Sequence, residues 1–194
     1  MRWVSILCLL VLGACAGAVR SGSSEEIGLV GPAAPSALQV QMFGPLVDLV
    51  GKRFRGQPVS ASSEMRTDFQ SWNWALGGTA IRVEHALEDG SYGGVTYVYP
   101  DRQSGDLAYV YITNSGFRTE GGFRLNSDGS WTAEEEVIGQ GEITRVRSTG
   151  RIREDGTMLS QGTYLNGSQW VPGPSFEYAP TDAELPVLRP PEGN

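Results

Sequence analysis

The sequence predicts an all-β protein: an antiparallel, up-and-down β-barrel of nine or ten strands with a short N-terminal helix. After Gly51, short segments alternate apolar and polar residues, and turn dipeptides separate them: Gly77-Gly78, Asp89-Gly90, Asp128-Gly129, Asp155-Gly156 and Asn166-Gly167. Asp-Gly and Asn-Gly between apolar runs are strong hairpin signals because both positions tolerate positive φ. A meander of so many hairpins has to close or curl, since open strand edges invite aggregation.

The short helix is expected between Ser36 and Val50. Ser36 suits the N-cap position, where its hydroxyl can accept a hydrogen bond from the first helical turn. Gly44-Pro45 interrupts the segment, because proline lacks a backbone N–H and clashes with the preceding turn. One or two helical turns are therefore expected on each side of this dipeptide.

The turns also predict which residues oppose one another. Two-residue loops pair Trp72 with Val83, Trp74 with Ile81, Gln70 with His85, His85 with Gly94, Ile81 with Val98, Ile152 with Leu159, Val146 with Leu165 and Thr163 with Trp170. Opposed residues share a face of the sheet. The face that these pairs define is mostly apolar and includes Val110, Ile112, Phe123, Trp131 and Ile152, whereas the other face is rich in Arg and Glu. The apolar face is predicted to line the barrel interior, because a one-residue slip would mix the two sets.

The N-terminus predicts export. The apolar run from Trp3 to Leu12 is too short to span a bilayer and ends in Leu12-Gly13-Ala14-Cys15, which resembles a bacterial lipoprotein signal cut before the cysteine. The alternative is an ordinary signal cut after Ala16 or Ala18. We therefore expect a lipid anchor on Cys15 in the cell envelope, facing the periplasm, or else a soluble periplasmic or secreted protein.

The expected organisation has four parts. Residues 1–14 form a lipoprotein-type signal peptide and 15–37 a flexible tether rich in Gly, Ser, Ala and Pro. Residues 38–178 form the barrel domain, and 179–194 form a proline-rich tail that is either an extended cover or a loose end.

Composition argues against several function classes. A formal net charge of −7 argues against non-specific nucleic-acid binding, which needs clustered Lys and Arg. Two cysteines and one histidine are too few for a Cys/His zinc site, and we expect neither a metal nor another cofactor.

Three segments relate the chain to a known family: Gly51-Lys52-Arg53-Phe54-Arg55-Gly56, Trp72-Asn73-Trp74-Ala75-Leu76-Gly77-Gly78-Thr79 and Thr96-Tyr97-Val98-Tyr99-Pro100-Asp101. Over roughly residues 51–178 the chain resembles bacterial lipocalin-like (calycin-type) exported lipoproteins. It departs from true lipocalins, whose opening Gly-x-Trp is replaced by Gly51 and Phe54 at a longer spacing. Thr67-Asp68-Phe69 resembles their Thr-Asp-Tyr turn but comes too early in the chain. The resemblance implies binding of a small molecule in the lumen.

A few polar residues are expected to point inward. Asp68, Gln70 and His85 lie together on neighbouring strands, where His85 is a general base, a proton donor to a ligand or a metal or haem ligand, or else simply bonds Gln70 or water. Glu135 is expected to face Val146 and Gly121. There it binds a cationic or hydroxyl-bearing ligand or acts as an acid, unless a bulge at Gly121-Gly122 turns it to solvent or it lies at the open end of the barrel.

Two features are expected on the exterior. The loop 139–142 pairs Glu136 with Arg145 and Glu134 with Arg147, which predicts a charge ladder outside the barrel. Five tyrosines are also expected outside, and the first four of them form one aromatic patch: Tyr97, Tyr99, Tyr109, Tyr111 and Tyr164. That patch is either covered by the N-terminal helix or the tail, or is a docking surface.

The leading functional hypothesis is a lipid-anchored barrel that binds a small apolar molecule. Its pocket is predicted to comprise Trp72, Trp74, Trp131 and Trp170, with Gln70, His85 and Glu135 as polar groups. One alternative is an envelope interaction module with a filled barrel and the tyrosine patch as its surface. Another is a small enzyme that uses His85 with Asp68 or Glu135.

Overall fold

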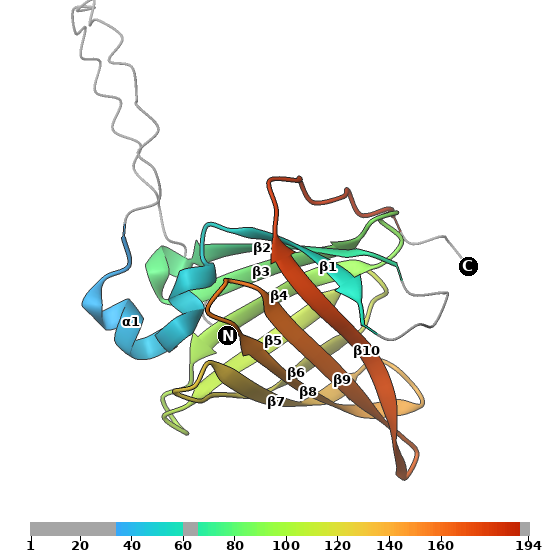
Figure 1. The fold of residues 1–194 in the computed structure, drawn as a ribbon. Helices are drawn as coiled ribbons and strands as arrows, with labels where there is room; N and C mark the ends of the chain where they lie inside the picture. Colours follow the sequence, from blue (N-terminus) through green and yellow to red (C-terminus); the bar gives the residue numbers. More distant parts are fainter. Residues whose placement is uncertain (1–33, 60–65, 191–194) are drawn as a thin grey trace, which may run out of the picture. The chain divides into compact units, whose positions relative to one another are not determined.

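A computed structural model describes residues 34–59 and 66–190 and shows a closed antiparallel barrel of ten strands (Figure 1). Each strand pairs with the next one along the chain, and β1 closes the barrel against β10. The strands are β1 (Arg53–Pro58), β2 (Asp68–Ala75), β3 (Ala80–Leu87), β4 (Gly93–Pro100), β5 (Leu107–Thr113), β6 (Arg118–Leu125), β7 (Ser130–Ile138), β8 (Ile143–Ile152), β9 (Met158–Asn166) and β10 (Gln169–Pro180). The predicted fold is confirmed. The expected signal peptide, Cys15 and the tether up to residue 33 lie outside the described residues.

The short helix is also confirmed. It comprises α1 (Ala37–Phe43) and the 3₁₀ helix η1 (Gly44–Leu49). Ser36 caps α1 in a capping box with Gln39: the Gln39 backbone N donates to Ser36 Oγ at 3.3 Å, and the Ser36 backbone N donates to Gln39 Oε1 at 2.8 Å. Phe43, Leu46 and Leu49 are at most 1% exposed and belong to the barrel's core, so the helices plug one end of the barrel.

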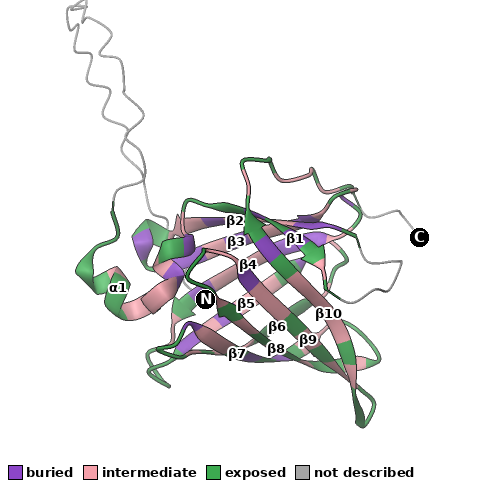
Figure 2. Cartoon of the chain, viewed as in Figure 1, coloured by how far each residue is buried: buried purple, intermediate pink, exposed green. Residues whose placement is uncertain are grey.

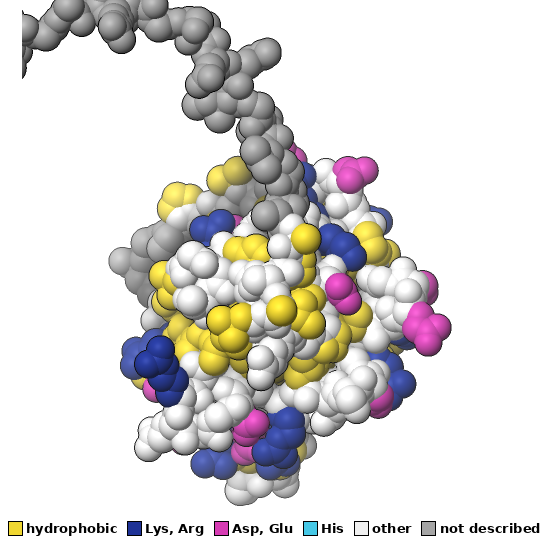
Figure 3. Space-filling model, turned by 90° about the vertical axis from the view of Figure 1, so that its left-hand side faces the viewer, with side chains coloured by type: hydrophobic (Ala, Val, Ile, Leu, Met, Phe, Trp, Pro, Cys, Tyr) yellow, Lys and Arg dark blue, Asp and Glu magenta, His cyan; other side chains and the backbone are white. Residues whose placement is uncertain are grey.

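The plugged end also exposes apolar side chains. Leu38 and Val40 of α1 are 63% and 47% exposed, and Leu76 of the 3₁₀ helix η2 (Leu76–Gly78) is 75% exposed. Gln39 Nε2 donates to the Gly78 carbonyl at 3.2 Å, which joins α1 to η2. Figure 3 views this end and shows hydrophobic side chains in the middle of the face.

The turns at Gly77-Gly78, Asp89-Gly90 and 139–142 produce the predicted pairs. Trp74 opposes Ile81, Gln70 opposes His85, and His85 opposes Gly94. The exterior ladder forms as expected, with N–O distances of 3.2 Å for Arg147–Glu134, 3.5 Å for Arg145–Glu134 and 3.9 Å for Arg145–Glu136. Such exposed pairs stabilise a fold by only about 0.2–1 kcal/mol each.

The predicted inward and outward faces of β5 were wrong. Val98 opposes Tyr109 and Thr96 opposes Tyr111, so both tyrosines point inward, whereas Ile112 is 51% exposed. From Leu107 to Ile112 both faces of this strand consist of aliphatic or aromatic residues, so its alternation does not distinguish inside from outside. The connection from β4 is a longer loop closed by a hydrogen bond from the Asp101 backbone N to the Asp106 carbonyl. The predicted exterior patch of four tyrosines therefore does not form, and only Tyr97 and Tyr99 of that patch remain outside.

The predicted faces of β9 were also wrong, by one residue. The Arg153 backbone N bonds the Thr157 carbonyl around a three-residue loop in which Gly156 has φ 80°, so Ile152 opposes Met158 instead of Leu159. A three-residue hairpin loop with glycine in the left-handed region is a common alternative to the two-residue loop. Ser160, Gly162 and Tyr164 consequently line the lumen, while Gln161 and Thr163 are exposed.

The prediction that Trp170 lines the lumen fails for the same reason. Trp170 opposes Leu165, is 37% exposed and lies outside the barrel, with the Arg147 guanidinium 4.3 Å from its ring centre. Later in β10 the register shifts between Pro172 and Ser175, and Phe176 and Tyr178 point inward.

The core is asymmetric. Strands β1–β5 hold most of the buried residues, whereas β8, which is described throughout, has none (Figure 2). After β10, residues 181–190 run without regular secondary structure, and the Arg189 backbone N donates to the Gly90 carbonyl at 2.8 Å. Of the two expectations for the tail, these residues match the extended cover, which lies over the β3–β4 turn.

Candidate functional site

The barrel lumen holds two adjoining cavities of about 560 Å³ and about 170 Å³. The larger, which we call the outer cavity, is lined by Leu87 and Tyr92 at the β3–β4 turn, and the smaller inner cavity is lined by Leu46 of the helical plug. Six residues line both cavities and form what we call the waist: Gln70, Thr96, Tyr109, Glu135, Ser148 and Ser160.

The inner cavity is mostly apolar. Besides Leu46 it is lined by Trp72, Val83, Val98, Phe123, Trp131, Ala133 and Met158. The rings of Phe123 and Trp131 stack with centroids 5.4 Å apart. Trp74 lines neither cavity and packs edge-on against Phe43 of the plug at 5.6 Å. Of the four predicted tryptophans, Trp72 and Trp131 therefore line the lumen, Trp74 supports the plug and Trp170 lies outside.

A hydrogen-bond network crosses the outer cavity. Tyr178 Oη donates to Asp68 Oδ2 at 2.7 Å, and Asp68 Oδ1 lies 2.9 Å from His85 Nδ1. His85 Nε2 lies 2.7 Å from Tyr111 Oη, which in turn lies 2.9 Å from Tyr92 Oη. The sequence grouped Asp68 with His85 correctly but missed Tyr111, because β5 was assigned the wrong face. Gln70 does not bond His85: its Oε1 accepts from Trp72 Nε1 at 3.1 Å.

The direction of this network depends on the protonation of His85. When the ring is neutral with its proton on Nδ1, Nε2 accepts from Tyr111, and Tyr111 accepts from Tyr92. When the ring is charged, Nε2 donates to Tyr111, Tyr111 donates to Tyr92, and the Tyr92 hydroxyl hydrogen is available to the cavity. Burial raises the pKa of Tyr92, Tyr111 and Tyr178, so these phenols remain protonated hydrogen-bonding groups.

Glu135 lies at the waist. Its side chain opposes Gly121 and Val146, as predicted, and the residue is 9% exposed, so the alternative of a bulge that turns it to solvent was wrong. Thr119 Oγ1 donates to Glu135 Oε2, and Ser148 Oγ donates to Oε1 at 3.5 Å. Burial raises the pKa of this carboxyl above its ordinary value. Within residues 34–59 and 66–190, Glu135 forms no ion pair.

Tyr109, like Ser160, is a waist residue that the sequence placed on the wrong side. It is 5% exposed, and its buried hydroxyl lies beside the Glu135 carboxyl, although no described residue offers it a partner within 3.5 Å. Burial and the nearby charge of Glu135 both raise the pKa of the phenol. Tyr109 on β5 and Glu135 on β7 both oppose Gly121 of β6, which has no side chain to separate them.

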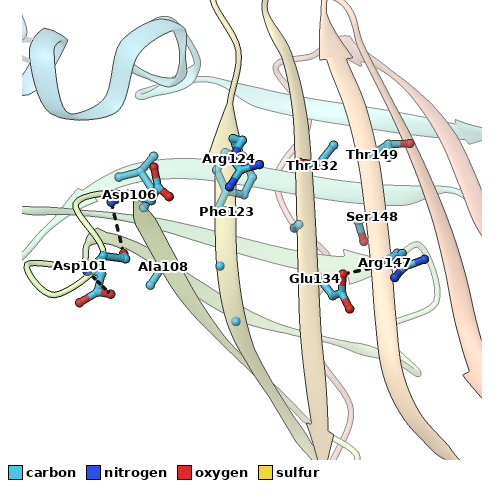
Figure 4. Close-up of a pocket in the computed structure, with 15 residues that line it drawn as sticks. Asp101, Asp106, Ala108, Phe123, Arg124, Thr132, Glu134, Arg147, Ser148 and Thr149 are labelled. Atoms are coloured by element: carbon cyan, nitrogen blue, oxygen red, sulfur yellow. Dashed lines mark hydrogen bonds and ion pairs between the residues drawn. The ribbon is translucent and has the colours of Figure 1, made fainter.

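A further hollow of about 580 Å³ lies on the exterior of β5–β8 (Figure 4). Its floor includes Gly122, where an added Cβ would meet nothing within 4 Å. Some of its charged side chains have partners, since Arg147 pairs with Glu134 and Asp101 accepts from the backbone N of Gln103 and Ser104, whereas Arg124 and Asp106 form no ion pair among the described residues. The lumen holds a buried acid, Glu135, that has no ion pair among the described residues, and it is therefore the stronger candidate site.

Among the described residues, no three His, Cys, Asp or Glu side chains are grouped so that they could hold a metal ion. None of the helices in the described ranges is both long and apolar enough to cross a membrane. The chain matches no protein-family model, and no curated protein is significantly similar to it in sequence.

Proposed function

We propose that this protein binds a small, largely apolar molecule in the barrel lumen, with a polar group at one end of that molecule. The observation that supports the proposal is the pair of adjoining cavities with different linings: Trp72 and Trp131 in the inner cavity, and tyrosines with Asp68 and His85 in the outer one. Their volumes, about 560 Å³ and about 170 Å³, suit an organic molecule, since ligand sites are commonly about 300–1,000 Å³.

The linings suggest the orientation of the ligand. Apolar surface that leaves water for the inner cavity contributes about 25 cal/mol per Å². A polar group without a partner is costly to bury, so the ligand's polar group lies at the waist, where Gln70, Glu135 and Tyr109 line both cavities.

Binding can be tested by titrating purified full-length protein with 1-octanol and following tryptophan fluorescence. We expect a saturable change, because Trp72 and Trp131 line the inner cavity. The Trp131→Phe variant should lose much of that change, whereas Trp170→Phe is the matched control, since Trp170 lies outside and is 37% exposed. A signal that disappears only in Trp170→Phe would place the probe outside the barrel and contradict the proposal.

We also propose that the protein is exported and anchored in the cell envelope through an acylated Cys15, in keeping with the lipocalin-like resemblance. The exposed Leu38, Val40 and Leu76 support this, because this apolar surface lies at the end of the barrel where the described chain begins. Mass spectrometry of protein from its own host should show an acyl increment on Cys15, and Cys15→Ala should abolish it. An unmodified Cys15, or cleavage after Ala16 or Ala18, would contradict the anchor.

The two alternative functions, an envelope interaction module and a small enzyme, have less support. The envelope interaction module depended on an exterior patch of four tyrosines, and Tyr109 and Tyr111 line the lumen instead. An enzyme that uses His85 needs a ring nitrogen available to the substrate, but Asp68 and Tyr111 lie within hydrogen-bond distance of the two nitrogens.

A further inference from the structure

We propose that the polar group of the ligand is a protonated amine, held at the waist by Glu135 and Tyr109. This inference rests on the proposed binding function and specifies the chemistry of the ligand's polar end. It selects a cation over the neutral hydroxyl, which the sequence left open as an alternative. Charge, hydrogen-bonding capacity and the aromatic walls of the outer cavity each support it.

The charges of the lumen favour a cation. Glu135 is buried and forms no ion pair in the described part of the chain, and the polar groups beside it are the neutral hydroxyls of Thr119, Tyr109 and Ser148. A buried carboxylate without a cation is costly, so a ligand that supplies one gains a favourable contact. The other acid, Asp68, has both oxygens engaged by His85 and Tyr178. An anionic ligand would meet two carboxylates.

Arg66, which also lines the outer cavity, does not reverse this charge balance. Its guanidinium pairs with Asp89, and its side chain is 50% exposed. No other Lys or Arg lines either lumen cavity among the described residues. His85 is held by Asp68, and the two form a compensated pair when the ring is charged. Glu135 is therefore the acid left to pair with the ligand.

The hydrogen-bonding groups match an ammonium. An ammonium group has N–H donors and no acceptor. The Glu135 carboxylate, whose bond from Ser148 is 3.5 Å long, retains acceptor capacity. The Tyr109 hydroxyl lies beside Glu135, and its oxygen is a second acceptor, because a hydroxyl that donates its hydrogen can still accept. Both residues oppose Gly121, which has no side chain to separate them and which lets β6 and β7 approach closely at this point.

The outer cavity adds aromatic surface around this point. Tyr92, Tyr111, Tyr164, Phe176 and Tyr178 line it. Aromatic faces attract organic cations, and the attraction strengthens when water is excluded. The inner cavity meanwhile accepts the hydrocarbon part of the molecule. The ligand class is thus an alkyl- or arylamine with at least one N–H.

Three probes of equal chain length test the inference by calorimetry on the full-length protein at pH 7: octylamine, 1-octanol and octanoate. We expect octylamine to bind about tenfold or more tightly than octanol, and octanoate to bind most weakly. Glu135→Gln keeps the shape of the side chain and removes its charge, so it should weaken octylamine by about tenfold and leave octanol within about twofold.

Glu134→Gln is the matched control, because Glu134 is the preceding residue of β7 and pairs with arginines on the exterior. It should leave all three affinities unchanged. Tyr109→Phe provides a second test should Glu135→Gln not fold, since it removes a single hydroxyl and changes no charge. It should weaken octylamine at least threefold, and octyltrimethylammonium, which has no N–H, should bind the wild type more weakly than octylamine.

The possible failures are distinguishable. If octanol or octanoate binds as tightly as octylamine, and Glu135→Gln leaves the affinity for octylamine unchanged, the assignment of an amine is wrong, whereas the proposed binding function is still supported. If octyltrimethylammonium equals octylamine and Tyr109→Phe has no effect, the proposed hydrogen bonding of the N–H groups is wrong. If none of the four probes binds, the proposed function itself fails.

Discussion

At the scale of single residues, burial decides what the polar groups of the lumen can do. Glu134 and Glu136 lie in the exterior ladder, whereas Glu135 between them is 9% exposed with only hydroxyl donors. Because water no longer solvates its charge, the pKa of Glu135 is raised above 4.5. Its chemical character therefore differs from that of its two neighbours on the same strand.

Glu135→Gln should stabilise the protein at neutral pH. The folded state holds the Glu135 proton more tightly than the unfolded state does. The stability contributed by this bound proton is therefore fully present below about pH 4.5 and is lost as the pH rises through the folded-state pKa. The glutamine side chain has nearly the same shape but carries no charge. We therefore expect the free energy of unfolding to rise by on the order of 1 kcal/mol at pH 8. Thermal unfolding should show this gain shrinking toward pH 4. A gain independent of pH would contradict this explanation.

Tyr178→Phe should destabilise the fold by about 1–3 kcal/mol. The hydroxyl donates to Asp68 Oδ2 at 2.7 Å, and both residues are 3% exposed, so the variant leaves a buried carboxylate oxygen without that donor. Urea unfolding monitored by circular dichroism measures the difference. Tyr99→Phe, on a side chain that is 38% exposed, is the control and should have little effect. Equal effects of the two variants would be evidence against the network.

At the scale of elements, β6 positions the waist because it has two adjacent glycines with different surroundings. An added Cβ on Gly121 would overlap the Glu134 carbonyl oxygen, whereas one on Gly122 would meet nothing within 4 Å. Gly121 permits the close approach of β6 and β7 at Glu135, and Gly122 forms part of the floor of the exterior hollow.

The two glycines allow a matched test. Gly121→Ala should destabilise the protein by about 1–3 kcal/mol, because the strands have to separate to admit the methyl group. It should also weaken binding of the octyl probes. Gly122→Ala should change the free energy of unfolding by less than about 0.5 kcal/mol. Similar free energies of unfolding for the two variants would show that close strand approach at Gly121 is not required.

At the scale of the whole barrel, the two ends differ. The helical plug closes the inner end with Phe43, Leu46 and Leu49, all at most 1% exposed, while the residues at the other end include Arg66, whose side chain is 50% exposed. A ligand that enters past Arg66 meets the tyrosines and the waist before the tryptophans. The plug thus defines which end of the ligand lies deepest.

Phe43→Ala should cost about 3–5 kcal/mol, because the buried ring contacts Trp74 edge-on at 5.6 Å and its loss leaves a cavity between plug and barrel. The free energy of unfolding in urea is the measurement. Leu38→Ala on the same helix is the control, since Leu38 is 63% exposed, and should change it by less than about 0.5 kcal/mol. A small effect of Phe43→Ala would mean that the plug does not contribute to the stability of the barrel.

Local signals determined much of this structure. The turn residues between β2, β3 and β4, and between β7 and β8, specify their pairs within a few residues of the chain. They therefore predicted the inward direction of Gln70, Trp72, His85 and Glu135 correctly. The capping box of α1 is equally local, because Ser36 and Gln39 satisfy each other's backbone N–H. For these elements the sequence by itself was sufficient.

Only the tertiary structure decided the faces of β5, β9 and β10, and with them Tyr109, Tyr111 and Trp170. Tyr109 and Val110 are both suited to a buried face, and the Asp155-Gly156 turn is compatible with loops of two or three residues. In the closed barrel, Tyr178 of β10 points inward: it lies opposite Gly56 of β1 and donates to Asp68 of β2. These contacts join residues more than 100 positions apart, so the energy that selects the face is absent from any short stretch of the sequence.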